Sequence, residues 1–306
     1  MGKVSIWLVS VVAALGALLG CAPQEPEQPL RYSDTPAAGG QPIYRLAIHP
    51  LYNPHKLVDL YQPLVNYLNS RVPEVRFEVE ASRDYAAYEE KIRRSEPAFL
   101  LPNPVQTLLA QQSGYRVVAM AGDPQDFKGI FIVRKDSNIR TPADLKGKTV
   151  SYPSPTALAA AIMPQSFLQS KGINLQTDIH NQYVGSQESA ILNTYMGNSS
   201  AAATWPPPWR VFQKDYPEEA AQLMQIWETP PLINNSVMVH ADVPVPLRDK
   251  VQSLLTGLNK TPEGKKLLQA LETSAFTAAD DRTYEVVRTY LDRFEKTVRP
   301  VKLSAP

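Results

Sequence analysis

The 306-residue sequence has little cysteine, little histidine and no excess of charge, and each shortage excludes a class of protein. Its single cysteine, Cys21, excludes an intrachain disulfide and a cysteine-based zinc site. The four histidines show neither HxxH nor HExxH spacing and have no carboxylates at ligand spacing, so we expect no metal and no cofactor. A formal net charge of +1 leaves no basic stripe for nucleic acid.

The composition indicates a globular protein that is preceded by a separate N-terminal segment. The chain is 43% hydrophobic and 20% charged, which is enough apolar material for a core, and its length suits one large or two ordinary domains. Many of the 28 prolines fall in the N-terminal stretch and in loops. A folded region that begins near residue 43 is therefore expected.

Residues 1–20 read as a lipoprotein signal peptide. Lys3 precedes an apolar run over 6–19 that is short for a membrane span, and the run ends in Leu-Leu-Gly-Cys, which resembles the bacterial lipobox. The resemblance implies cleavage before Cys21 and lipidation of that residue, which would anchor the protein in the bilayer. An ordinary signal peptide or an uncleaved anchor is the alternative.

The expected location is therefore the bacterial cell envelope, on the periplasmic side of a membrane. Ala22 stands where an aspartate would signal inner-membrane retention, which favours the outer membrane in a Gram-negative cell. Residues 21–42 are rich in proline, glycine and polar residues, so they predict a flexible tether between the lipid and the folded part.

Strand and helix patterns alternate from residue 43 onward and predict an α/β fold of two lobes. Apolar strand patterns and helical periods follow one another through residue 121, as in a parallel sheet covered by helices. A second, smaller α/β unit follows the strand at 129–134. We assign 43–134 with 230–306 to lobe 1 and 135–229 to lobe 2, which leaves two crossovers and a cleft between the lobes.

The loops that follow the predicted strands should meet at this cleft, because ligands of open α/β sheets bind beyond the carboxyl ends of the strands. The turn at 153–156 draws most attention, since it leads from a strand into an alanine-rich helix. The first N–H groups of a helix have no internal partner and favour an anion. Ser154 and Thr156 add hydroxyls there, although both could simply cap the helix.

The sequence is similar to the phosphate/phosphite/phosphonate-binding proteins of ABC transporters, the PhnD-like family of type 2 periplasmic binding proteins. The resemblance covers about residues 43–295 and rests on DFKGIFIVRKDSNIRTPADLKGKTV, the turn that follows it, and YVGSQESAILNTYMGNSSAAATW. It implies a two-lobed fold, with a mixed sheet in each lobe, that captures a small oxyanion by lobe closure and delivers it to a permease. In the family, hydroxyls and N–H groups at a helix start hold the oxyanion, here Ser154, Thr156 and Ala157.

The sequence departs from the family pattern at several of these positions. The usual Ser-Thr-Ser-Gly turn is Ser-Pro-Thr-Ala over 154–157, a ligand-contacting tyrosine is replaced by Phe127, and a second aromatic position is Leu101. No carboxylate stands near 206–208 or at Asn235, where binders of aminoalkylphosphonates place acids on the ligand's amine. These differences weigh against an amine-bearing phosphonate and leave other small solutes open.

The candidate ligand-binding residues lie on the cleft loops. Trp205 and Trp209 flank three prolines, Lys128 adjoins Phe127 on the opposite face of a strand, and Tyr52, Tyr85, Asn103 and Asn235 fall at strand ends or helix starts. For each of them, packing or turn formation is the alternative. The complete set is Tyr52, Tyr85, Asn103, Phe127, Lys128, Ser154, Thr156, Ala157, Thr204, Trp205 and Asn235.

Two other functions compete with transport. An enzyme is disfavoured, because Ser154 has no GxSxG elbow or local base and no paired carboxylates stand in a hydrolase-like context. A ligand sensor that reports to a membrane kinase or cyclase would use the same lobe closure, so the sequence does not separate it from transport. The expected partners are a small anionic or polar solute, a permease or sensor, and the bilayer, for a monomeric protein.

Overall fold

The computed structural model of the protein describes residues 40–301 and contains two separate β-sheets. The signal peptide, Cys21 and nearly all of the expected tether lie outside the described residues. Between residues 40 and 301, no helix is both long and apolar enough to cross a bilayer.

The first sheet has six strands in the order β11-β4-β10-β3-β1-β2. Strand β1 runs parallel to β2 and β3, whereas β10 and β11 run antiparallel to their neighbours, so the sheet is mixed. Its strands are β1 (Ile43–Ile48), β2 (Arg76–Glu80), β3 (Phe99–Leu101), β4 (Tyr115–Ala121), β10 (Ser236–His240) and β11 (Phe276–Ala278).

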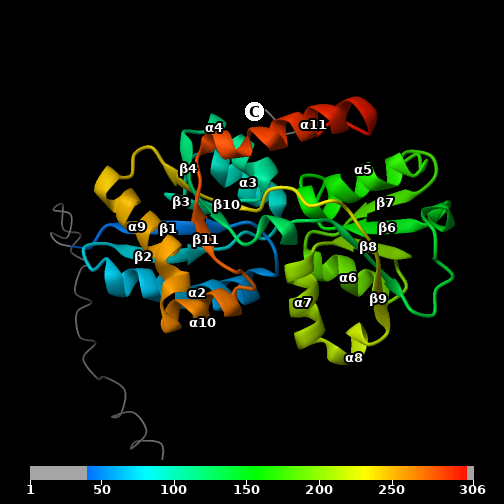
Figure 1. Ribbon diagram of the computed structural model, residues 1–306, viewed down its shortest axis with the longest axis horizontal. Helices are drawn as coiled ribbons and strands as arrows, with labels where there is room; N and C mark the ends of the chain where they lie inside the picture. The colour runs from blue at the N-terminus through cyan, green and yellow to red at the C-terminus, as the bar shows by residue number, and fades with distance from the viewer. Residues whose placement is uncertain (1–39, 302–306) are drawn as a thin grey trace, which may run out of the picture. The chain divides into compact units, whose positions relative to one another are not determined.

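Helices cover both faces of this sheet (Figure 1). Side chains alternate along each strand, so Ala47 and Leu100 face one hydrophobic cluster while Ile48 and Leu101 face the other. The first cluster lies under α3 (Tyr85–Arg93), α4 (Pro104–Gln112) and α11 (Glu285–Thr297); the second lies under α2 (Pro54–Arg71), α9 (Val245–Gly257) and α10 (Pro262–Ala270). We call this sheet with its helices the first lobe.

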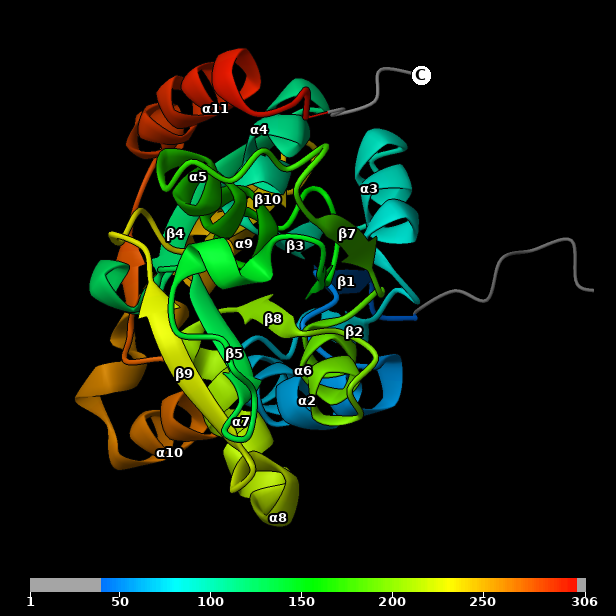
Figure 2. The ribbon, with the colours of Figure 1, turned by 90° about the vertical axis from the view of Figure 1, so that its right-hand side faces the viewer.

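The second sheet has five strands in the order β7-β6-β8-β5-β9 and forms the second lobe. Helix α5 (Met163–Ser170) covers one face, and α6 (Gln187–Tyr195) and α7 (Pro206–Asp215) cover the other (Figure 2). The short helix α8 (Pro217–Ala220) leads into β9. The strands are β5 (Ile130–Arg134), β6 (Thr149–Tyr152), β7 (His180–Tyr183), β8 (Ala201–Thr204) and β9 (Leu223–Glu228).

The fold confirms the expected pair of mixed sheets covered by helices, with three local differences. Strand β5, which we assigned to lobe 1, pairs with β8 and β9 of the second sheet. All four residues of 130–133 are buried there, and an apolar run of that kind fits a central strand of either sheet. Strand β11 was not predicted, because three residues carry too little pattern.

The third difference concerns the helix after β6. It begins with a π-helical turn, Leu158–Ile162, in which Ile162 N–H donates to the Ala157 carbonyl oxygen at 3.0 Å. The α-helical part follows directly, from Met163. Ala157 is therefore the N-cap residue, and the Ser154–Thr156 turn lies one step before the helix start.

Candidate functional site

A small cavity lies where the loops after strands of both sheets meet. The first lobe contributes residues that follow β1 and β3, begin α3 and precede β10, and the second lobe contributes the start of the π-helical turn and of α6 and α7. Phe127 lies on the connection from β4 to β5. The lining residues are His49, Tyr85, Asn103, Phe127, Ala157, Leu158, Ala159, Ala160, Gln187, Trp205 and Asn235.

Backbone N–H groups supply hydrogen-bond donors on one wall. Ala157 caps the π-helical turn, and its carbonyl oxygen accepts from the first intrahelical donor, Ala161 N–H, at 2.8 Å. The N–H groups of residues 158–160 precede that donor and have no partner within the helix. Donors at a helix start, with the partial positive charge of the dipole, suit the oxygens of an anion.

Asn235 offers a second polar group. It precedes β10, is 3% exposed, and its Oδ1 is buried without a hydrogen-bond partner among the described residues. The backbone around it is well satisfied: Asn235 N–H donates to Asn234 Oδ1 at 2.8 Å, and Asn235 O accepts from Ala121 N–H at 2.8 Å. A buried amide oxygen without a partner is uncommon, and it marks a place for a hydrogen-bond donor of a ligand.

His49 is the third polar group, and the sequence analysis did not select it. It directly follows β1, its side chain is buried, and its Nδ1 lies 2.9 Å from the Leu101 carbonyl oxygen. Burial lowers the pKa of His49 to about 4, although the hydrogen bond to Leu101 opposes this effect. The ring is therefore neutral at ordinary pH. Its place immediately after a strand was the signal that could have identified it.

Aromatic rings form the remaining walls. Phe127 and Trp205 lie 5.3 Å apart between ring centroids and are almost fully buried. The Tyr85 ring meets His49 edge-on at 6.2 Å, and burial raises the pKa of its hydroxyl. Such walls exclude water, which strengthens each hydrogen bond made to a ligand inside. Trp209, by contrast, stacks on Phe212 beneath the second sheet.

Gln187, another residue that the sequence analysis missed, joins the lobes beside Tyr85. Its Nε2 donates to the Tyr85 hydroxyl at 3.4 Å, and its Oε1 accepts from Thr204 Oγ1 at 2.8 Å. Thr204 is therefore one step removed from the cavity and orients Gln187. Ser186 caps α6 and places Gln187 at the first helical position, which is the local feature that could have revealed it.

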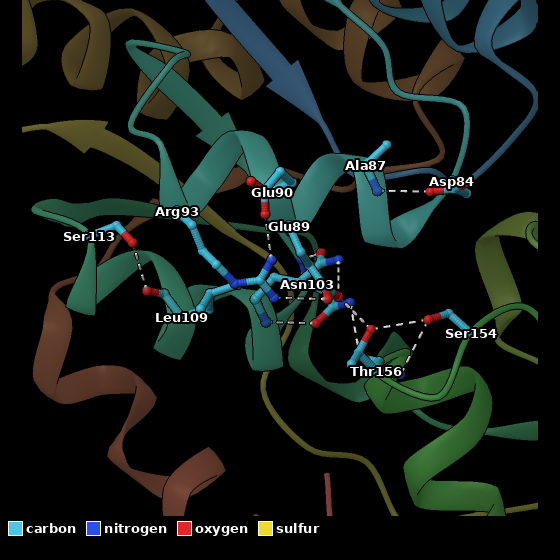
Figure 3. A network of polar contacts seen from close by, with 11 residues as sticks. Asp84, Ala87, Glu89, Glu90, Arg93, Asn103, Leu109, Ser113, Ser154 and Thr156 are labelled. Carbon is cyan, nitrogen blue, oxygen red and sulfur yellow. Dashed lines mark hydrogen bonds and ion pairs between the residues drawn. The ribbon is translucent and has the colours of Figure 1, made fainter. Parts of the chain in front are cut away.

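The hydroxyls of Ser154 and Thr156 are bound to protein groups and do not line the cavity. Thr156 Oγ1 donates to Glu89 Oε1 at 2.5 Å and lies 3.1 Å from Ser154 Oγ (Figure 3). Ser154 Oγ also accepts from Thr156 N–H at 3.3 Å. The sequence predicted that both hydroxyls face a ligand. In the structure the Thr156 hydroxyl binds the carboxylate of Glu89, a residue of the other lobe, and the Ser154 hydroxyl contacts Thr156.

Glu89 is held in this buried position by donors from both lobes. Besides Thr156, Gln106 Nε2 donates to its Oε1 at 3.2 Å, and Arg93 lies 3.9 Å from its Oε2. Burial raises the pKa of the Glu89 carboxyl, while the hydrogen bonds from Thr156 and Gln106 act in the opposite direction. A buried carboxylate beside the cavity disfavours further negative charge nearby.

Asn103 combines a capping role with a contact between the lobes. Its Oδ1 accepts from Val105 N–H and Gln106 N–H and caps α4, and its Nδ2 donates to the Thr156 carbonyl oxygen at 3.3 Å. Asn103 therefore has the local backbone role that the sequence analysis gave as an alternative, and it also lines the cavity.

Two predicted residues lie away from the cavity. Tyr52 is buried against Lys56, whose Nζ lies 4.8 Å from the ring centroid. Lys128 forms an ion pair with Glu228 at 2.9 Å. Like Phe127, it lies in the connection before β5 and not in a strand, so the alternation of strand side chains does not place it.

Ion pairs also connect the lobes next to α2 and α7. Lys56 Nζ lies 3.0 Å from Glu188 Oε2 and 2.6 Å from Asp215 Oδ2, both in the second lobe. Burial disfavours the charged form of Lys56, but the two carboxylates outweigh this effect and raise its pKa. Arg210 similarly reaches Glu272 and Asp126, at 2.8 Å in each case.

In the part of the chain that the structure describes, no cation lines the cavity and no cluster of metal-ligating side chains is present. The lining residues include no lysine or arginine, and the nearby Lys56, Arg93 and Arg210 are bound to carboxylates. Within residues 40–301, no three His, Cys, Asp or Glu side chains gather closely enough to hold a metal ion. The cavity therefore offers neutral hydrogen-bonding groups and aromatic walls.

Residues 46–284 match the family model described as "ABC transporter, phosphonate, periplasmic substrate-binding protein". The chain belongs to this family. Its members are described as substrate-binding proteins of a transporter, not as enzymes, and as periplasmic.

Individual curated proteins match this chain at low sequence identity. The chain is 22% identical over 182 residues to a probable phosphite-binding protein of an ABC transporter, PhnD1 of Prochlorococcus marinus, which covers 55% of this chain and 61% of that protein. It is 23% identical over 170 residues to the phosphonates-binding periplasmic protein of Escherichia coli, covering 54% and 50%. It is 25% identical over 154 residues to the tetrathionate sensor histidine kinase TtrS of Salmonella typhimurium, covering 48% and 26%. The chain thus matches less than two thirds of each.

Solved structures share the fold. A binding component of an ABC phosphonate transporter from Pseudomonas aeruginosa aligns with a TM-score of 0.78 at 17% identity, over 84% of this chain and 88% of that one. PhnD1 from Prochlorococcus marinus, in complex with methylphosphonate, aligns with a TM-score of 0.75 at 18% identity, over 84% and 100%. At this identity the likeness supports the two-lobed architecture.

Proposed function

We propose that the protein captures a small oxyanion of the phosphate, phosphite or phosphonate kind between its lobes and delivers it to an ABC transporter. One observation carries the proposal: three consecutive residues with helix-start N–H groups line one cavity between aromatic walls, beside the buried Asn235, whose unpaired Oδ1 can accept from an O–H group of the ligand. Lobe closure would bury the ligand there, away from water. Family membership and the methylphosphonate complex of a structural neighbour support the ligand class.

In this proposal the ligand contacts come from Tyr85, Phe127, Ala157, Trp205 and Asn235, with His49 and Gln187 added by the structure. Asn103, Ser154, Thr156 and Thr204 act indirectly, through the hydrogen bonds that join the lobes or orient Gln187. The protein would work as a monomer of two lobes, residues 43–129 with 230–301 and residues 130–229, anchored to the envelope membrane by acylated Cys21.

A thermal-shift screen tests the ligand class. Phosphate, phosphite, methylphosphonate, sulfonates and nitrogenous heterocycles are added in turn to the purified folded region. A ligand present at about 100 times its Kd stabilises the folded state by about 2.7 kcal/mol, so a true ligand raises the apparent Tm clearly. A shift with one of the phosphorus oxyanions supports the proposal. A shift with heterocycles alone, and none with any oxyanion, would contradict it.

Anchoring has a separate test. The Cys21→Ser variant should appear in the soluble fraction of the cell envelope, because the residue that would carry the lipid is gone. If this variant stays membrane-bound and unprocessed, residues 1–20 act as an ordinary anchor.

Ligand sensing is the second candidate function, and the match to the sensor histidine kinase TtrS favours it. Lobe closure would then present the loaded protein to a membrane sensor instead of a permease. Deleting the gene and measuring uptake of the bound oxyanion separates the two. Lost uptake supports transport, whereas normal uptake with an altered transcriptional response supports sensing.

A further inference from the structure

His49 presents its Nε2 to the cavity as a hydrogen-bond acceptor, because a backbone carbonyl oxygen holds the ring proton on Nδ1. The Leu101 carbonyl oxygen can only accept, so the 2.9 Å contact with His49 Nδ1 requires the proton on Nδ1. In the neutral ring Nε2 then carries a lone pair, and no described residue donates to it. His49 lines the cavity and is 2% exposed, so this acceptor is available to a ligand and little else.

Among residues 40–301, burial and the hydrogen bond to Leu101 are the influences on the pKa of His49, and no charged group contributes. Tyr85, on α3, is the titratable ring in edge-on contact with it, and burial raises the pKa of that hydroxyl, so Tyr85 stays neutral. Glu89, also on α3, is bound to Thr156 and Gln106. From β3, the neighbour is the Leu101 backbone. With its pKa at about 4, His49 itself stays neutral above that pH.

The charge around the cavity is unsuited to a doubly charged anion. The lining residues include no cation, and the buried Glu89 lies one hydrogen bond beyond the wall formed by Ala157. Burying a charge without a counterion is expensive, and the expense grows steeply with a second charge. Hydrogen bonds from the N–H groups of residues 158–160 compensate a single negative charge more readily than two.

Resting on the proposed function, we infer that the site selects the singly protonated form of its oxyanion. One ligand oxygen keeps its hydrogen and donates it to His49 Nε2, while the other oxygens accept from the helix-start N–H groups and from Asn235 Nδ2. The ligand class is thus a monoanion that carries an O–H group, such as hydrogen methylphosphonate or dihydrogen phosphate. The O–H group is the feature that the site requires, because an acceptor left buried without a donor weakens binding.

Methanesulfonate is the matched probe. It has nearly the shape of methylphosphonate and one negative charge, but it has no oxygen-bound hydrogen at ordinary pH. At about pH 5.5, where His49 is neutral and methylphosphonate is mostly a monoanion, we expect methylphosphonate to bind at least about tenfold more tightly, since methanesulfonate leaves Nε2 unpaired. Equal affinity for the two would overturn the inference.

Calorimetric titration of the wild-type protein with methylphosphonate provides the proton count. Above the second pKa of the ligand, the affinity should fall about tenfold per pH unit, with uptake of about one proton. At about pH 5.5, titrations in buffers of different ionisation enthalpy should show almost no proton exchange, because the monoanion already carries the hydrogen. Uptake of one proton there would mean that His49 becomes charged, which contradicts the inference.

The His49→Phe variant tests the residue itself. Phenylalanine keeps a ring against Tyr85 and removes the acceptor, so the preference for methylphosphonate over methanesulfonate should shrink toward unity. His180→Phe, at an exposed position on β7, is the matched control and should keep the wild-type ratio. Thermal unfolding confirms that each variant is folded. An unchanged ratio in a folded His49→Phe protein would overturn the role of His49.

These outcomes are separate from the failure of the proposed function. If neither phosphorus oxyanions nor sulfonates bind at any pH, the oxyanion proposal itself is wrong. If methylphosphonate binds with an affinity that does not change above its second pKa, the function stands and the selection of the monoanion is wrong.

Discussion

The two lobes are joined on opposite faces of their sheets by different chemistry. Beside α3 and α4, the contact is a buried hydrogen bond from Thr156 to Glu89, supported by Asn103. Beside α2 and α7, the contacts are ion pairs of Lys56 and Arg210 that are partly open to solvent. The buried contact requires complete closure and dehydration, whereas the ion pairs tolerate water and act over a longer range.

This difference indicates separate roles in closure. The ion pairs can attract the lobes toward one another before they meet, and the Glu89 contact can form only when they have met. The buried face lies next to the ligand's N–H donors, because Thr156 directly precedes Ala157. We therefore expect the buried hydrogen bond to affect ligand affinity more than the ion pairs do.

The largest effect should follow Thr156→Val. The substitution leaves the buried Glu89 carboxylate without its shortest hydrogen bond, which costs about 1–3 kcal/mol in the closed state and weakens oxyanion binding about 5- to 150-fold. Calorimetric titration measures the change. Thr277→Val, at an exposed position on β11, is the control and should bind as the wild type does. If Thr156→Val binds the oxyanion as tightly as the wild type does, the buried hydrogen bond to Glu89 does not contribute to ligand affinity.

Glu89→Gln should weaken ligand binding less than Thr156→Val does, and its effect on the stability of the folded protein should depend on pH. The amide oxygen can still accept from Thr156, so the contact persists. In the wild type, the raised pKa of Glu89 means that the folded protein holds this proton more tightly than the unfolded chain does. Stability is therefore lost as pH rises from the ordinary carboxyl range through the folded-state pKa.

The variant lacks this loss, so its stability relative to the wild type should increase with pH across the same range. Urea unfolding at about pH 4 and about pH 8 measures the difference. A difference that is the same at both pH values would show that burial does not penalise the Glu89 carboxylate.

Lys56→Met should weaken ligand binding by a still smaller factor. Removing the lysine leaves Glu188 with the Tyr216 hydroxyl as a donor, so the expected loss is about 1 kcal/mol, or about fivefold in affinity. Lys250→Met breaks an exposed ion pair with Glu74 within the first lobe and should leave affinity unchanged. If Lys56→Met weakens binding more than Thr156→Val does, the ranking of the two faces is reversed.

Salt should have the smallest effect. Raising ionic strength from about 0.05 M to about 1 M shortens the screening length to about 3 Å, which weakens the partly exposed ion pairs and spares the buried hydrogen bond. We expect a loss of affinity of only a few-fold in the wild type, and a smaller loss in Lys56→Met. The same salt dependence in both proteins would show that Lys56 does not contribute to closure.

Much of this architecture follows from local patterns in the sequence. The loops after strands were expected to converge, and Asn103, Phe127 and Trp205 do line one cavity, because strand–loop–helix succession identifies the carboxyl ends of strands. Asn235 joins them from the start of β10, which runs antiparallel to its neighbours. The partner of Thr156 was not predictable, since Glu89 lies 67 residues away and belongs to the other lobe. The same holds for β5, whose apolar run fits either sheet, and for the tautomer of His49, which depends on Leu101.

A crystal structure of the protein with methylphosphonate tests the central claim most directly. We expect ligand oxygens about 3 Å from the N–H groups of residues 158–160 and from Asn235 Nδ2, with Thr156 still bound to Glu89. A ligand held instead by the Ser154 and Thr156 hydroxyls, with the Glu89 contact broken, would contradict it.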